Sequence, residues 1–91
     1  MTDLEKVDVE LARYFHALLR FSVREHDGAV ELVMDLKRPL GGTHVYYKAI
    51  PARDIHHRDF NALFQKFLYD CMRDYLVQMF LRTPDSWEGD Y

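Results

Sequence analysis

The chain has 91 residues, of which 48% are hydrophobic and 14% aromatic, and its formal net charge is −3. This length fits one domain, near the lower limit for a self-sufficient hydrophobic core. One cysteine excludes an internal disulfide framework and a multi-cysteine zinc site, and the slight acidity provides no general attraction to nucleic acid or anionic membranes.

A first helix is predicted from about Asp3 to Leu19. Thr2 and Glu5 have the spacing of a capping box, in which each side chain satisfies a backbone amide of the other. Apolar residues then recur at helical spacing on one stripe. This stripe consists of Leu4, Val7, Leu11, Tyr14, Phe15, Leu18 and Leu19.

The acidic start of the chain is unlike the basic start and apolar run of a signal peptide. No apolar run approaches the ~20 residues that span a bilayer. We therefore expect no membrane association and a cytoplasmic location, in the host cytoplasm if the gene is viral.

The stretch from Phe21 to Lys37 predicts a β-hairpin. Asp27-Gly28 favours a two-residue type I′ turn, because both positions need positive φ. The turn pairs His26 with Ala29, and this register separates the side chains into two faces. The apolar face consists of Phe21, Val23, Val30, Leu32, Met34 and Leu36, and the other face gains the charge pairs Arg24/Glu31 and Arg20/Asp35.

A third strand is predicted from Thr43 to Ile50, after a loop at 38–42. Its two sides are Val45, Tyr47 and Ala49 on one, and His44, Tyr46, Lys48 and Ile50 on the other. Because both sides carry a large apolar residue, we expect an edge strand with Tyr46 facing outward. The free backbone groups of such an edge can accept another strand.

The longest apolar pattern runs from His57 to Arg82 and predicts the helix around which the domain is built. Asp54 is expected to cap it, and Thr83-Pro84 to end it. Its two apolar rows are Phe60, Phe64, Leu68, Met72, Leu76 and Phe80, and Leu63, Phe67, Cys71, Tyr75 and Met79. Such a helix is roughly 39 Å long, and a three-stranded sheet is about 14 Å across. It therefore needs further cover, from the first helix, from another copy or from another protein.

These elements predict a single α+β domain over residues 1–82, in the order α-β-β-β-α, and a short acidic tail at 83–91. An antiparallel three-stranded meander packs on the C-terminal helix, and the N-terminal helix flanks it.

No residue pattern indicates catalysis, a metal or a cofactor. The five histidines lack the His-x-x-x-His spacing of a zinc site, and both phosphate-binding glycine patterns are absent. Cys71 lies on the apolar face of the long helix, where a buried thiol is unreactive. We therefore expect a protein that is not an enzyme and that holds neither a metal nor a cofactor.

The expected function is a protein–protein interaction module, a small inhibitor or adaptor that occupies a partner protein's surface as a homodimer. This role would suit a phage or mobile-element protein. The residues expected to bind the partner are Tyr46, Lys48, Arg53, His56, His57, Arg58, Trp87 and Tyr91.

Two alternatives remain. The order of helix, three strands and helix is that of a double-stranded-RNA-binding domain, so the basic junction at 48–58 is an alternative nucleic-acid surface, although the net acidity argues against it. The second alternative is that the protein is a small non-catalytic subunit of a larger enzyme.

Overall fold

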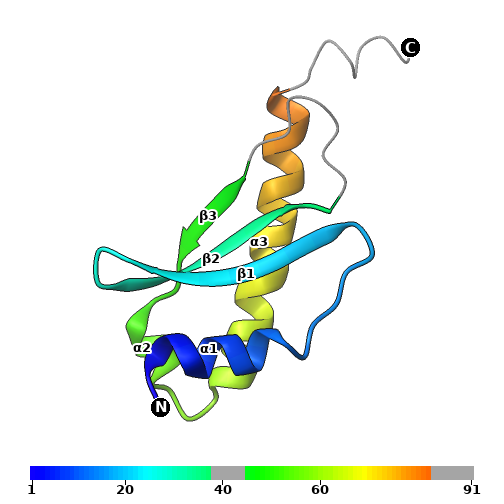
Figure 1. Cartoon of the computed structure of the whole chain (residues 1–91). Coiled ribbons are helices and arrows are strands. Elements are labelled where there is room, and N and C mark those ends of the chain that lie inside the picture. Colours follow the sequence, from blue (N-terminus) through cyan, green and yellow to red (C-terminus); the bar gives the residue numbers. More distant parts are fainter. Residues whose placement is uncertain (38–44, 83–91) are drawn as a thin grey trace, which may run out of the picture.

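The computed structural model describes residues 1–37 and 45–82 and confirms the predicted α+β architecture (Figure 1). An antiparallel sheet with strand order β1-β2-β3 has α3 behind it, and α1 lies beside the N-terminal half of α3. The elements are α1 (Asp3–Leu11), β1 (Leu19–His26), β2 (Ala29–Leu36), β3 (Tyr46–Ala49), α2 (Ala52–Ile55) and α3 (Phe60–Arg82). His44, Trp87 and Tyr91 lie outside the described residues.

The β1–β2 hairpin has the predicted register along its whole length, from His26 opposite Ala29 onward. Asp27 and Gly28 have φ angles of 52° and 77°, as a type I′ turn requires. The two predicted charge pairs also form, with nitrogen–oxygen distances of 2.6 Å for Arg20 to Asp35 and 2.9 Å for Arg24 to Glu31.

The core lies between the sheet and α3. Its buried members on α3 are Phe60, Phe64, Leu68, Cys71 and Tyr75, and on β2 they are Val30, Leu32 and Met34. The predicted burial of Cys71 is thus confirmed. Other apolar residues of α3 remain in contact with solvent, since Tyr69, Leu76 and Val77 are each about half exposed.

The first helix is shorter than predicted, because α1 ends at Leu11 rather than Leu19. The predicted capping box is present at its start. After the helix, His16 Nδ1 accepts the backbone N–H groups of Leu18 and Leu19 at 3.0 and 3.2 Å. This turn directs the chain into β1, where Leu19 pairs with Leu36. Of the predicted helical stripe, Leu19 thus belongs to the hairpin, and Tyr14, Phe15 and Leu18 lie in the loop that precedes it.

The long helix begins later than predicted, at Phe60 instead of His57. Asp54 does not cap it, because Asp54 lies inside the separate short helix α2, whose N-cap is Pro51. Between the two helices, the Asp59 N–H donates to His57 Nδ1 at 2.9 Å. From Phe60 to Arg82 the helix is continuous. Among the described residues, no helix is both long enough and apolar enough to cross a membrane.

Candidate functional site

The outer edge of β3 is the first component of the candidate site. In the part of the chain that the structure describes, β3 pairs with β2 on one side and is the last strand of the sheet on the other. An unpaired strand edge presents a row of backbone donors and acceptors to its surroundings. The predicted edge position of this strand is therefore confirmed.

The pairing with β2 determines which backbone groups of β3 point outward. Ile50 donates its N–H to the Val30 carbonyl at 2.8 Å. Because bonded and non-bonded pairs alternate in an antiparallel ladder, Lys48 is the next residue of β3 that bonds to β2. The N–H and C=O groups of Tyr47 and Ala49 therefore point away from β2, toward the open edge.

A groove with a volume of about 400 Å³ between β3 and α3 is the second component. It combines apolar and charged side chains, and the charges have both signs. The residues that line it include Phe67, Val77, Lys48, Asp70, Arg73 and Asp74. Phe67 is half-buried and Val77 is half exposed. A side chain from an added strand would thus meet apolar surface and a charged partner in the same groove.

The wall of this groove is held in place by a bond between the sheet and α3. The Tyr46 hydroxyl donates to Asp74 Oδ2 at 2.9 Å, and the Tyr46 ring lies 5.8 Å from the Tyr75 ring. Burial, followed by the hydrogen bond to Asp74, raises the pKa of Tyr46. Burial also raises the pKa of the neighbouring Cys71 thiol, so the thiol stays neutral and is a poor nucleophile.

The orientation predicted for Tyr46 is wrong. Tyr46 is 4% exposed and belongs to the core, because it pairs with the buried Met34 and its ring therefore points to the α3 side. Tyr47 is the aromatic residue that faces outward. Lys48 is exposed, as expected for a residue that contacts a partner, and it lies in the groove.

Tyr47 is a site residue that the sequence reasoning missed. The Arg24 guanidinium lies 4.3 Å from the centre of the Tyr47 ring, and Glu31 holds Arg24 at 2.9 Å. One residue from each strand thus fixes this ring on the outer face of the sheet. The predicted Arg24/Glu31 pair, together with the alternation of β3, was the signal that could have found it.

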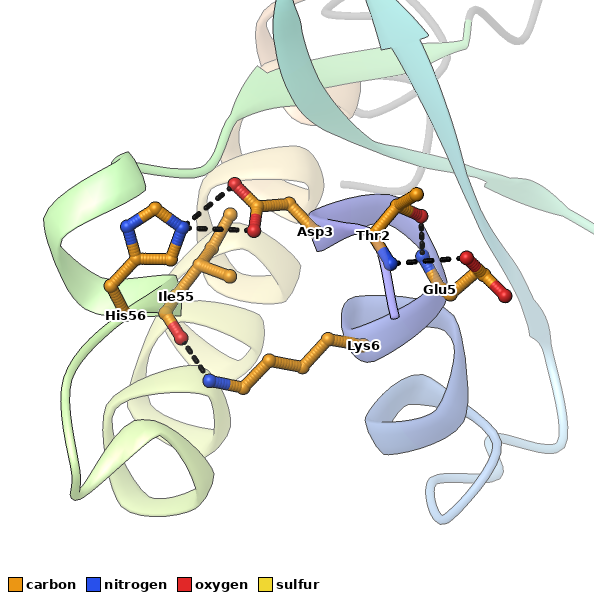
Figure 2. A network of polar contacts seen from close by, with 6 residues as sticks. All are labelled: Thr2, Asp3, Glu5, Lys6, Ile55 and His56. Carbon is orange, nitrogen blue, oxygen red and sulfur yellow. Dashed lines mark hydrogen bonds and ion pairs between the residues drawn. The ribbon is translucent and has the colours of Figure 1, made fainter.

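The other predicted binding residues lie at α2 and the turn that follows it, apart from the groove. His56 Nε2 lies 2.9 Å from Asp3 Oδ1, and the Lys6 ammonium donates to the Ile55 carbonyl (Figure 2). Figure 2 shows the His56 ring facing the start of α1, so this residue links two helices.

The remaining basic residues of this junction have acidic neighbours or a structural task. Arg53 lies 4.0 Å from Asp54, and His57 accepts the Asp59 N–H. Arg58 is exposed. The junction at 48–58 is therefore divided between Lys48 in the groove and a cluster around α2 in which basic and acidic side chains are mixed. These two parts do not form one continuous basic surface for a nucleic-acid backbone.

The loop between α1 and β1 exposes a second apolar feature that the sequence reasoning placed on a helix. Phe15 and Leu18 are 84% and 67% exposed, and the Lys37 ammonium lies 4.1 Å from the centre of the Phe15 ring.

Within residues 1–37 and 45–82, no group of three or more histidine, cysteine or acidic residues could hold a metal ion.

The β3 edge and the groove beside it are the structural features from which a function can be proposed. In comparisons with known proteins, no family model, no curated protein and no solved structure matches this chain.

Proposed function

We propose that this protein is a non-catalytic protein-binding module, a small inhibitor or adaptor, that takes an extended polypeptide segment as an additional strand along β3. The observation that carries this proposal is the open β3 edge beside the groove against α3. Strand addition of this kind uses backbone hydrogen bonds for affinity and side-chain pockets for specificity.

The expected binding free energies show why both the strand edge and the groove are needed. Tyr47 and Ala49 offer two N–H and two C=O groups, and each net hydrogen bond contributes about 1 kcal/mol. Four such bonds provide about 4 kcal/mol, which corresponds to a Kd of about 1 mM. Tighter binding must come from apolar contacts in the groove, at about 25 cal/mol for each Å² removed from water. The side chains that reach Phe67 and Val77 therefore decide which segment binds.

The buried, protonated side chains of Cys71 and Tyr46 in the groove wall support a binding role over a catalytic one. The Cys71 thiol is 2% exposed and its pKa is raised by burial, whereas a catalytic thiol needs a lowered pKa and access to a substrate. Tyr46 is equally buried, and its hydroxyl is engaged with Asp74.

A random peptide library selected on the folded protein tests the proposal. We expect enriched peptides that bind to the parent and lose about fivefold or more in affinity with Ala49→Pro, which removes one outward N–H. Ala49 is exposed, and proline is tolerated at an edge when its missing N–H faces solvent.

Glu25→Pro is the matched control. Glu25 is exposed and lies opposite Val30 in a non-bonded pair, so its N–H points outward from β1, the other edge of the sheet. Peptide binding should survive this change. Failure to select any peptide, or peptides whose binding is indifferent to Ala49→Pro, would contradict the proposed function.

A further inference from the structure

The charges beside the β3 edge indicate what kind of segment fits there. Lys48 and Arg73 provide two cations, and Asp70 and Asp74 provide two carboxylates. A groove selected for a strongly charged foreign peptide would carry mainly the opposite sign, whereas an equal mixture fits a surface that pairs with itself. Within the described part of the chain, Lys48 makes no ion pair.

We propose that the segment that occupies this edge is β3 of a second copy of the chain, in an antiparallel pairing that sets Tyr47 opposite Tyr47 of the second copy. This inference rests on the proposed strand addition at β3 and names its occupant. The two three-stranded sheets then form one continuous sheet across a two-fold axis.

Among the symmetric registers that the outward backbone groups allow, one sets Tyr47 opposite Ala49 of the second copy and another sets Tyr47 opposite Tyr47, and the charges distinguish these two. With Tyr47 opposite Ala49 of the second copy, Lys48 faces Lys48 directly, and like charges in this position are destabilising. That register also brings Val45 opposite Pro51, which has no N–H to donate.

With Tyr47 opposite Tyr47, Lys48 instead faces Tyr46 of the second copy. The Tyr46 hydroxyl is bonded to Asp74 at 2.9 Å, so the Lys48 ammonium meets a carboxylate across the interface. The two-fold axis provides this favourable contact twice, once in each direction. The selected register therefore satisfies the one cation of β3.

The outer face of the paired strands also matches in this register. Val45 and Tyr47 are large apolar residues, 40% and 47% exposed, and the pairing sets Val45 opposite Ala49 and the two Tyr47 rings against each other. Within each copy, the guanidinium of Arg24 on β1 already lies 4.3 Å from the centre of the Tyr47 ring. Pairing thus covers apolar surface on one face and joins opposite charges on the other. A foreign strand and a second copy compete for the same edge.

Light scattering on the purified chain over a range of concentrations is the first part of the test. We expect a monomer–dimer equilibrium in the parent and in the control Glu25→Pro. In Ala49→Pro the Kd of the dimer should rise about tenfold or more, because two interface hydrogen bonds are lost per dimer.

Cysteine cross-linking determines the register and remains informative if a proline variant fails to fold. Residues that exchange both hydrogen bonds across an antiparallel pair have Cα atoms about 5.5 Å apart, within disulfide range. Tyr47→Cys should therefore form a covalent dimer under mild oxidation. Ala49→Cys lies on the same face of β3 but is displaced from its counterpart by four residues, so it should stay monomeric, as should the parent with its buried Cys71.

The outcomes separate the two proposals. A parent that stays monomeric at every concentration, or equal cross-linking of both cysteine variants, overturns self-pairing. If the parent stays monomeric but selected peptides bind to it and lose affinity for Ala49→Pro, strand addition stands with a foreign partner. If the parent stays monomeric and no peptide binds, both proposals fail. Cross-linking confined to Tyr47→Cys, together with dimer loss in Ala49→Pro, supports both.

Discussion

The hydroxyl of Tyr46 joins the edge strand to the long helix. Its ring is buried, and its bond to Asp74 on α3 keeps one wall of the groove in place. Because burial and this bond favour the protonated phenol, the pKa of Tyr46 lies above its usual value of 10.0. Tyr14 and Tyr75 have pKa values raised mainly by burial as well.

This raised pKa makes stability fall at alkaline pH. Above about pH 10 the unfolded chain releases the Tyr46 proton while the folded chain retains it, so the free energy of unfolding falls as pH rises, by up to about 1.4 kcal/mol per pH unit. Tyr46→Phe should cost about 1 kcal/mol at pH 7 through the lost hydrogen bond, and its stability should fall less steeply above pH 10. Urea unfolding from pH 7 to 11 measures both effects. Tyr69→Phe, at a half-exposed position, should retain the parent's slope, and equal slopes in all three proteins would contradict the assignment.

The turn residue Gly28 gives a second prediction at the scale of one residue. Its φ is 77°, and a Cβ atom there would meet nothing within 4 Å. Gly28→Ala should therefore cost only the backbone term of a left-handed residue, about 1 kcal/mol, and Gly28→Asn should cost less, since asparagine tolerates this region. Chemical denaturation of the two variants checks the order. A loss above about 3 kcal/mol in Gly28→Ala would indicate a side-chain clash that the structure does not contain.

At the scale of elements, α3 provides the surface on which the sheet and α1 assemble. Phe64 is 1% exposed, and its ring packs against Tyr14 from the loop after α1 at 5.9 Å and against Phe60 at 5.6 Å. The helix therefore contributes most through residues that contact several elements at once.

Phe64→Ala should cost about 3–5 kcal/mol, a large fraction of the ~5–15 kcal/mol that stabilises a small domain. Its exposed neighbour Gln65 is the control, and Gln65→Ala should change the free energy of unfolding by less than about 0.5 kcal/mol. Thermal melting followed by circular dichroism distinguishes them. Equal melting temperatures for the two variants would refute the position of the core.

The elements differ in how well the sequence predicts them, for physical reasons. The hairpin is predicted residue by residue because the Asp27-Gly28 turn and the alternation of both strands require the same register. The end of α1 is not, because Tyr14, Phe15, Leu18 and Leu19 continue the helical stripe although the helix ends at Leu11 and Leu19 begins β1. The choice depends on the pairing of Leu19 with Leu36, which helix spacing does not reveal.

At the scale of the whole molecule, the sheet has one face on α3, and β3 is its last strand in the part of the chain that the structure describes (Figure 1). The sequence predicts this edge, since both sides of β3 carry large residues. It does not predict the groove, because Tyr46 and Tyr47 are chemically alike and alternation alone does not state which of them faces the core. The pairing of Tyr46 with Met34 decides this. The separation of Lys48 from Arg53 and His56 likewise depends on the path of the chain through α2.

Amide hydrogen exchange along β3 tests the central claim, strand addition at this edge, most directly. In the dilute, unoccupied chain, the Tyr47 and Ala49 amides should exchange fast, while the Lys48 amide, bonded to β2, should exchange slowly. When a second copy or a selected peptide occupies the edge, exchange at Tyr47 and Ala49 should slow by at least about tenfold, with Lys48 little changed. Unchanged exchange at Tyr47 and Ala49 after binding, or full protection of both in the dilute chain, would contradict the account.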